Sequence, residues 1–169
     1  MGSAEFYDTS QNISGPSNGV LGDAHFYNNS VNNGGISMGN AYFHDNSHSE
    51  NNGQIAQDAT FDCRAYNNAS IIFGTIYYSA CTLYYRADGS NRNWSELSLW
   101  FSDGGYSTQA LRLPSSVDTV HINTDVTSAS DGTPTVLTLN ASSSANIGIS
   151  INATNANFSD NTVQSGNLT

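Results

Sequence analysis

The chain of 169 residues contains four arginines, no lysine and 14 acidic residues, which gives a net charge of −10. Nucleic-acid binding needs a basic surface, and so does recruitment to anionic lipid, so the composition argues against both. It holds no run of 18 apolar residues, and we expect no membrane insertion. Charged residues make up only 11% of the chain, and asparagine, serine, threonine and glycine supply most of its polarity. That profile is typical of extracellular surface or fibre proteins.

The first part of the chain repeats one phrase four times, with copies that start at Ala4, Ala24, Ala41 and Ala59. Each copy opens with apolar residues at alternate positions, as in Ala4-Glu5-Phe6, which is the period of a half-buried strand. A turn-forming stretch rich in Asn and Gly follows, and then a short apolar exit. The near-constant spacing of these alanines is typical of β-solenoid rungs.

One rung cannot bury its phenylalanine alone, whereas rungs stacked about 4.8 Å apart can. Stacking predicts an internal ladder of Phe6, Phe26, Phe43 and Phe61, and amide ladders of asparagines at the corners. We therefore predict an all-β fold, a parallel β-solenoid with rungs of about 17–20 residues. A small antiparallel sandwich is the alternative, but the repeat in residue identity favours the solenoid.

The two cysteines, Cys63 and Cys81, are separated by one repeat length. In a solenoid of that period they would occupy the same position on adjacent rungs, within reach of a disulfide. A disulfide would fit an oxidising compartment. Two free, buried thiols that act as small hydrophobic groups are the alternative.

From Thr75 the chain becomes strand-dense and aromatic, and the regular repeat ends at Tyr85. A loop rich in Gly, Asp and Asn follows, and then a segment that holds both tryptophans. Strand-like alternation resumes after Leu113. We therefore expect three parts: solenoid rungs over residues 4–85, a loop and Trp-rich insertion over 86–112, and solenoid rungs over 113–169 up to an uncapped C-terminal edge.

The segment Asn93-Trp94-Ser95, with Leu99-Trp100 and then Leu113-Pro114 before Asp118-Thr119-Val120-His121-Ile122, resembles a module of large bacterial surface proteins. In that family a Trp-rich stretch precedes a Leu-Pro-x-x-x-Asp-x-Val-x-Ile strand, and solenoid repeats similar to Ala-x-Phe-x-Asp-x-Ser accompany it. The resemblance covers most of the chain. It implies a right-handed parallel β-helix in a repetitive extracellular protein, and it says almost nothing about activity.

The tail returns to the opening phrase in Ala156-Asn157-Phe158-Ser159-Asp160-Asn161-Thr162, so the last rung reads as the natural predecessor of the first. Solenoids normally end in atypical capping repeats, and none is recognisable here. The chain is therefore a slice of a longer array, a protomer that stacks head-to-tail, or a rod with unfamiliar caps. If the chain stacks head-to-tail, its partner is another copy of the same chain. The residues expected at the assembly edges are then Ala4, Phe6, Phe158 and Leu168.

Enzymes on β-helices use carboxylates on a solenoid face, and Asp8, Asp45 and Asp62 stack approximately on successive rungs, with Arg64 nearby. Asn28 takes the same place in the second rung, which favours a solvated polar ladder over catalysis. We therefore expect no enzyme activity and no cofactor, with calcium as the one ion that stacked carboxylates would attract.

The histidines are the remaining candidates for a metal site, and the aromatics for a binding surface. His25, His44, His48 and His121 show no convergent metal-ligand spacing. Trp94 and Trp100 are candidate glycan contacts, because exposed aromatic planes grip sugar rings; the alternative is that they anchor the insertion on the solenoid. The function expected is a structural subunit of an extracellular or cell-surface fibre or array, with an adhesive, carbohydrate-binding module as the alternative.

Overall fold

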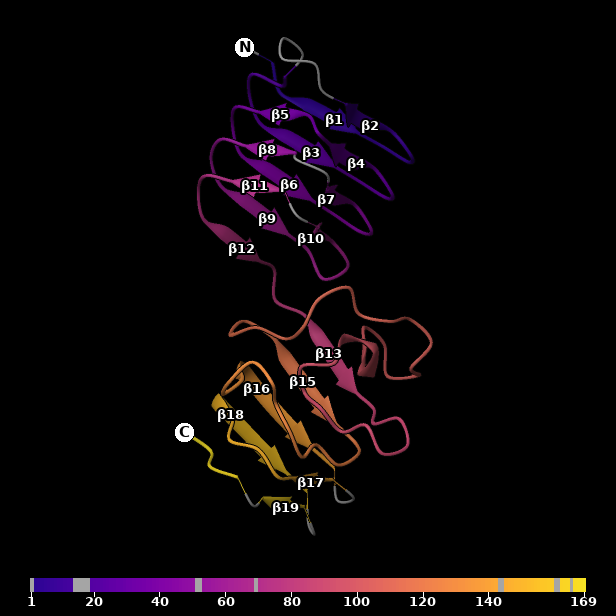
Figure 1. The fold of residues 1–169 in the computed structure, drawn as a ribbon, viewed down its shortest axis with the longest axis vertical. Coiled ribbons are helices and arrows are strands. Elements are labelled where there is room, and N and C mark those ends of the chain that lie inside the picture. The colour runs from indigo at the N-terminus through magenta and orange to yellow at the C-terminus, as the bar shows by residue number, and fades with distance from the viewer. Residues whose placement is uncertain are drawn as a thin grey trace. The chain divides into compact units, whose positions relative to one another are not determined.

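The structure, a computed structural model, describes residues 2–13, 19–50, 53–68, 70–142, 145–159, 162–164 and 166–169. Contacts divide the chain into two compact units, Met1–Ser79 (unit 1) and Ala80–Thr169 (unit 2). Each unit is a stack of strands (Figure 1). Within the described residues, no helix is long and apolar enough to cross a membrane.

Unit 1 is built from short strands that recur in the same order along the chain, and the rungs that start at Ala24, Ala41 and Ala59 each supply one strand to each of three sheets. The sheet orders are β1-β3-β6-β9-β12, β10-β7-β4-β2 and β11-β8-β5. Every pair of these strands is parallel, which excludes the antiparallel sandwich and confirms the predicted parallel β-solenoid. The strands are β1 (Ala4–Phe6), β2 (Gln11–Ile13), β3 (Ala24–Phe26), β4 (Val31–Asn33), β5 (Ile36–Ser37), β6 (Ala41–Phe43), β7 (His48–Glu50), β8 (Gln54–Ile55), β9 (Ala59–Phe61), β10 (Tyr66–Asn68), β11 (Ile71–Ile72) and β12 (Ile76–Tyr78).

The repeat in the sequence is also the repeat in space. Ala4 pairs with Ala24, Ala24 with Ala41, and Ala41 with Ala59, and Ile76 continues the column. Each step from one alanine to the next therefore makes one rung. The number of residues from one alanine to the next differs slightly between rungs, and the segments between the strands differ in length accordingly.

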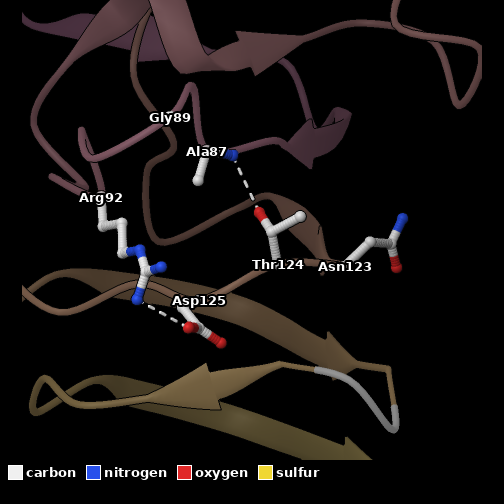
Figure 2. Close-up of a pocket in the computed structure, with 6 residues that line it drawn as sticks. All are labelled: Ala87, Gly89, Arg92, Asn123, Thr124 and Asp125. Atoms are coloured by element: carbon white, nitrogen blue, oxygen red, sulfur yellow. Dashed lines mark hydrogen bonds and ion pairs between the residues drawn. The ribbon is translucent and has the colours of Figure 1, made fainter.

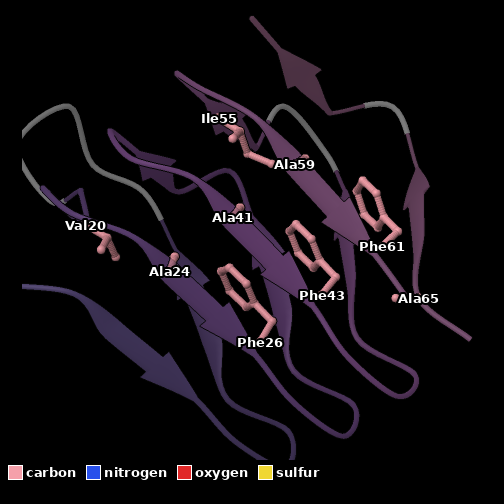
Figure 3. Close-up of a cluster of buried hydrophobic side chains, with 9 residues drawn as sticks. All are labelled: Val20, Ala24, Phe26, Ala41, Phe43, Ile55, Ala59, Phe61 and Ala65. Carbon is pink, nitrogen blue, oxygen red and sulfur yellow. The ribbon is translucent and has the colours of Figure 1, made fainter. Parts of the chain in front are cut away.

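The inward phenylalanines form the ladder that holds unit 1 together. Consecutive rings of Phe6, Phe26, Phe43 and Phe61 lie 4.7 Å apart, with interplanar angles of 6°, 5° and 8°. The last three rings are fully buried and lie on successive strands (Figure 3). Full burial of such a side chain contributes about 1.5–3 kcal/mol, so the ladder is a main source of stability.

A polar ladder runs inside the same unit. The Asn12 amide donates to the Asn32 side-chain oxygen at 2.9 Å, and the Asn32 amide donates to the Ser49 hydroxyl at 3.2 Å. All three side chains are buried, and each is satisfied from a neighbouring rung, which removes most of the cost of burying a polar group. Gly35 leaves the space that this ladder needs, because a Cβ there would overlap the Asn12 amide.

The turn after the first strand of a rung explains the Asp and Asn of the repeat. Asp8, Asn28 and Asp45 have φ angles of 57°, 58° and 55°. The first of these turns is closed by a bond of 3.0 Å from the Ser10 N–H to the Tyr7 carbonyl, and equivalent bonds close the other two. Asp and Asn enter this left-handed region more readily than other residues with a side chain, so their choice follows from the backbone.

Unit 2 has one main sheet of order β14-β13-β15-β16-β18 and a small sheet of β17 and β19. β14 is antiparallel to β13, and the other pairs are parallel. Because β13 pairs directly with β15, residues 86–118 leave the stack and return to it as the insertion. The elements are β13 (Thr82–Tyr85), the 3-10 helix η1 (Leu97–Leu99), β14 (Trp100–Phe101), β15 (Thr119–Ile122), β16 (Thr135–Ala141), β17 (Asn146–Ile147), β18 (Asn152–Phe158) and β19 (Val163–Gln164).

The last rung of unit 2 repeats two hydrogen bonds of the rungs of unit 1. The Thr162 N–H donates to the Ser159 carbonyl at 3.1 Å, and the Thr162 hydroxyl donates to the Ala141 carbonyl at 3.4 Å. In unit 1 the hydroxyl of Ser30 donates to the Phe6 carbonyl in the same way. The recurrence of the opening phrase in the tail is therefore structural; Asp160 and Asn161, the middle of that phrase, lie outside the described residues.

Both cysteines are disulfide-bonded, and neither is free. Since the chain has only two cysteines, the bond links Cys63 to Cys81.

Candidate functional site

Within the described residues, β1 and β18 each have a neighbouring strand on one side only. These two strands carry Ala4, Phe6 and Phe158, three of the four residues expected at the assembly edges. β18 is seven residues long and contains no charged residue. In β1 the only charged residue is Glu5. Edge strands are normally protected by charges, prolines or bulges, and β18 contains neither a charge nor a proline. Its start is covered, because the Ala153 N–H donates to the Thr169 carbonyl at 3.0 Å. Over the described chain, the later part of β18 is therefore the open template for strand pairing.

One backbone hydrogen bond recurs between successive rungs. It shows which backbone N–H and carbonyl groups lack a partner at these two edges, among the described residues. In unit 1 the Tyr27 N–H donates to the Phe6 carbonyl at 2.9 Å, and the His44 N–H donates to the Phe26 carbonyl at 2.8 Å. In unit 2 the Ser159 N–H donates to the Ala141 carbonyl at 3.1 Å. Two groups therefore end the series within the described chain: the Tyr7 N–H has no preceding carbonyl, and the Phe158 carbonyl has no following N–H.

A side-chain bond repeats in the same register. The Ser47 hydroxyl donates to the Phe26 carbonyl at 3.0 Å, as the Ser30 hydroxyl does to the Phe6 carbonyl. Ser10 holds the equivalent position in the first rung, where the described chain offers no earlier carbonyl. The Phe158 carbonyl is thus matched by two donors of the opposite edge, the Tyr7 N–H and the Ser10 hydroxyl.

The apolar groups at the edges are incompletely covered. Phe6 is only partly buried, although its ring stacks on Phe26, and Ala4 beside it is also partly buried. Phe158 is 39% exposed and Leu168, which bridges to Ile151, is 37% exposed. In the interior of the ladder the equivalent rings are fully buried, so each edge lacks the layer that an interior rung would receive.

The outer face of the first sheet carries stacked aromatic rings. Tyr7 stacks on Tyr27 at 4.8 Å, Tyr27 on His44 at 4.7 Å, and His25 on Tyr42 at 4.6 Å. A sugar ring stacks on the face of an aromatic ring, and here neighbouring rungs cover most of those faces, with the exception of Tyr7 at the β1 edge. The ladder therefore presents mainly ring edges to solvent.

The two tryptophans do not lie where a sugar could reach them, which corrects their assignment as glycan contacts. Trp94 is 4% exposed and Trp100 is fully buried. The Trp100 indole N–H donates to the Trp94 carbonyl at 2.8 Å, and its ring packs edge-on against Trp94 and Tyr85. Burial of both rings anchors the insertion to the body of unit 2, which was the alternative reading of the sequence.

The carboxylates proposed as a stacked row are only partly in register. Asp8 and Asp45 share a column with Asn28 between them, and the Asn28 amide donates to Asp8 at 3.2 Å while its N–H donates to Asp45 at 3.2 Å. Asp62 lies one position earlier, in the column of His44, which it contacts at 2.7 Å. The row is thus a hydrogen-bonded Asp-Asn-Asp ladder, and Asp62 does not belong to it.

The histidines lie on outer faces in different surroundings. His48 contacts Glu50 at 3.5 Å and stacks on Tyr66, and His121 stacks on Tyr84. Burial lowers the pKa of His121 below its ordinary value. Over the described ranges, no group of three or more His, Cys, Asp or Glu side chains is arranged to hold a metal ion.

A buried charge cluster around Asp118 was not foreseen from the sequence. Its carboxylate accepts two hydrogen bonds from Arg112, at 2.6 and 2.9 Å, and further bonds from the N–H groups of Cys81 and Ser115, at 2.9 and 2.7 Å. Asp118 is fully buried. The Asp of the Leu-Pro-x-x-x-Asp motif therefore fixes the start of β15, and the motif itself was the signal for it.

The loops of unit 2 form an open polar pocket of about 330 Å³ (Figure 2), lined by Ala87, Gly89, Arg92, Asn123, Thr124 and Asp125. The Arg92 guanidinium donates to the Asp125 carboxylate at 2.8 Å, and the Ala87 N–H donates to the Thr124 hydroxyl at 2.8 Å. Sequence reasoning missed this pocket, because its residues come together only when the insertion folds back beside the end of β15.

Comparison of the chain with protein-family models, with curated proteins and with solved structures gave no match.

Proposed function

We propose that the protein is a non-enzymatic structural subunit of an extracellular fibre or surface array, in which the β18 edge of one copy pairs with the β1 edge of the next. The observation that carries the proposal concerns the hydrogen bonds that join successive rungs. The donors left without an acceptor at the β1 edge match the acceptor left without a donor at the β18 edge. Tyr7 and Ser10 supply donors at one edge, and the Phe158 carbonyl supplies the acceptor at the other, in the pattern that joins neighbouring rungs inside each unit.

The repeat also defines the register of this pairing. Ala156 would lie opposite Ala4, Asn157 opposite Glu5 and Phe158 opposite Phe6, as the equivalent residues of β1 and β3 do. Such a register brings the two partly exposed phenylalanines into one ladder. It places neutral Asn157 beside the only charged residue of β1, so no like charges meet in this strand pair.

The two edges differ from one another, so contact between them is heterologous, and a heterologous contact that does not close into a ring produces a filament. Each backbone hydrogen bond contributes roughly 0.5–1.5 kcal/mol net. Burial of the Phe6 and Phe158 faces adds to this sum. The disulfide is consistent with an oxidising, extracellular compartment and supports that part of the proposal.

The proposal is tested by negative-stain electron microscopy and light scattering of the purified chain over a concentration series. Wild type should form filaments, and Tyr7→Pro should not, because proline removes the N–H donor of the β1 edge. That N–H has no partner among the described residues of the same chain, so the isolated fold should tolerate the change.

Tyr7→Phe is the matched control, since it keeps both the N–H and the stacked ring and should assemble as wild type does. A wild-type chain that stays monomeric at the highest concentration, with its solenoid intact by circular dichroism, would refute the head-to-tail contact. Equal assembly of Tyr7→Pro and Tyr7→Phe would refute the proposed edge.

A further inference from the structure

The ion pair at the pocket of Figure 2 is placed for binding more than for holding the loops together. The side chains of Arg92 and Asp125 are 43% and 29% exposed, and ion pairs this exposed contribute little to stability. The backbone already secures the segment, because the Arg92 carbonyl accepts the Thr127 N–H at 3.0 Å. The charged atoms at the pocket thus remain accessible in a loop that other bonds hold.

The Asp125 carboxylate is held in one orientation. One of its oxygens accepts the Asn146 N–H at 2.9 Å, and the other accepts from Arg92 at 2.8 Å. The bond from the Ala87 N–H to Thr124 fixes the opposite wall (Figure 2). Polar groups fixed in this way lose little entropy when they bind a ligand.

A strained tyrosine stiffens the same region. Tyr106 has a φ of 55°, which is rare for a bulky residue, and strain of this kind marks functional segments more often than others. Its hydroxyl accepts the amide of Asn123, a pocket residue, at 2.5 Å, and Arg86 lies over its ring at 5.3 Å. The insertion therefore places the Tyr106 hydroxyl against Asn123, one residue of this pocket.

We propose that the pocket binds a neutral saccharide, with Asp125 accepting a hydrogen bond from one hydroxyl and Arg92 donating to the neighbouring hydroxyl. A carboxylate and a guanidinium side by side offer the acceptor and the donor that a vicinal diol requires. The pair is neutral overall, and the chain carries a net charge of −10, which disfavours an anionic ligand. A volume of about 330 Å³ lies at the small end of ligand sites and suits one or two sugar rings.

The test is saturation-transfer NMR and calorimetry with lactose, maltose, cellobiose and mannobiose, and with digalacturonate as the anionic comparison. At least one neutral disaccharide should bind, and Asp125→Asn and Arg92→Gln should each weaken it about tenfold or more, since each removes a charge-assisted hydrogen bond. Glu96→Gln, a charge change in the same insertion away from the pocket, should leave the affinity unchanged. Circular dichroism establishes that each variant is folded, and Arg92→Gln decides if Asp125→Asn fails to fold.

The proposal is overturned if none of the four neutral sugars binds, if digalacturonate alone binds, or if Arg92→Gln binds as tightly as Glu96→Gln. None of these results depends on filament formation, because binding is measured on the chain in dilute solution or on the Tyr7→Pro variant.

Discussion

The carboxylate of Asp118 and the guanidinium of Arg112 face one another in the interior of unit 2, joined by two hydrogen bonds of 2.6 and 2.9 Å. An ion pair in a protein interior is costly unless the remaining lone pairs are also satisfied. Here the Cys81 and Ser115 N–H groups fill them. One carboxylate thereby ties the insertion, the start of β13 and the start of β15 together.

Replacement of Asp118 by Asn should destabilise the protein by about 3–5 kcal/mol, because it leaves the buried Arg112 charge uncompensated. Urea unfolding followed by circular dichroism measures the change. Asp88→Asn, the same substitution at a position outside the cluster, should stay within about 0.5 kcal/mol of wild type. Similar losses in the two variants would contradict the role assigned to the cluster.

The same pair predicts a dependence on acid. Burial works to raise the pKa of Asp118, but the hydrogen bonds and charge of Arg112 and the bonds from Ser115 outweigh it, and the pKa is lowered. A carboxyl with a lowered pKa in the folded state adds stability above its unfolded pKa of about 3.9, and that stability disappears as the pH falls through the folded value. The free energy of unfolding should therefore fall more steeply below about pH 4 in wild type than in Asp118→Asn.

The ionisation of Tyr85 predicts how the free energy of unfolding changes at alkaline pH. Its ring is fully buried, and burial raises the pKa of its hydroxyl to about 12. Because the unfolded chain ionises near pH 10, stability is complete below that value and is lost as the pH rises toward the folded pKa. Tyr85→Phe should therefore flatten the alkaline loss of stability measured by urea unfolding.

Within the described residues the Tyr85 hydroxyl has no hydrogen-bond partner, so its removal should also raise stability at neutral pH by roughly 1 kcal/mol. If Tyr85→Phe loses stability at alkaline pH as steeply as wild type, another group causes that loss.

The phenylalanine ladder predicts a difference between its middle and its end. Phe43 is fully buried between two rings, so Phe43→Ala should cost about 3–5 kcal/mol. Phe6 stacks on one ring only and is partly buried, so Phe6→Ala should cost clearly less in the monomer. Denaturant unfolding of both variants at low concentration checks the order, and equal losses would argue against an open end at β1.

The fold of unit 1 could be predicted because the same residue types recur at equivalent positions of each rung. Ala4, Ala24, Ala41 and Ala59 occupy one column, so counting from alanine to alanine gives the register directly. The same count would have separated Asp62 from Asp45, since Asp62 follows its alanine by three positions and Asp45 by four.

The insertion could not be predicted in the same way, because no repeat constrains it. Burial of Trp100 depends on its indole bond to the Trp94 carbonyl and on packing against Tyr85, and none of these follows from local pattern. Arg112 and Asp118 lie close together in the sequence, but the third member of their cluster, Cys81, is far away. In a segment without a repeat, the sequence does not distinguish an exposed aromatic residue from a buried one.

The register of the proposed filament contact can be tested by cross-linking two single variants. Glu5 and Asn157 project from the outer faces of their strands and would lie opposite one another in adjacent copies, about 4.8 Å apart between Cα atoms. That separation is within the range of disulfides. A mixture of Glu5→Cys and Asn157→Cys chains should therefore form a covalent dimer on mild oxidation, detected by non-reducing electrophoresis.

The matched control for this cross-link is a mixture of Glu5→Cys with Asn155→Cys. Asn155 lies on the same strand and the same face, two positions out of register, and the shift of about 7 Å along the strand places its Cα beyond disulfide range. A dimer with Asn157→Cys and none with Asn155→Cys supports the pairing of Phe158 with Phe6. Equal yields would mean that the chains meet without a defined register, and filaments, if they form, would then be held by another surface.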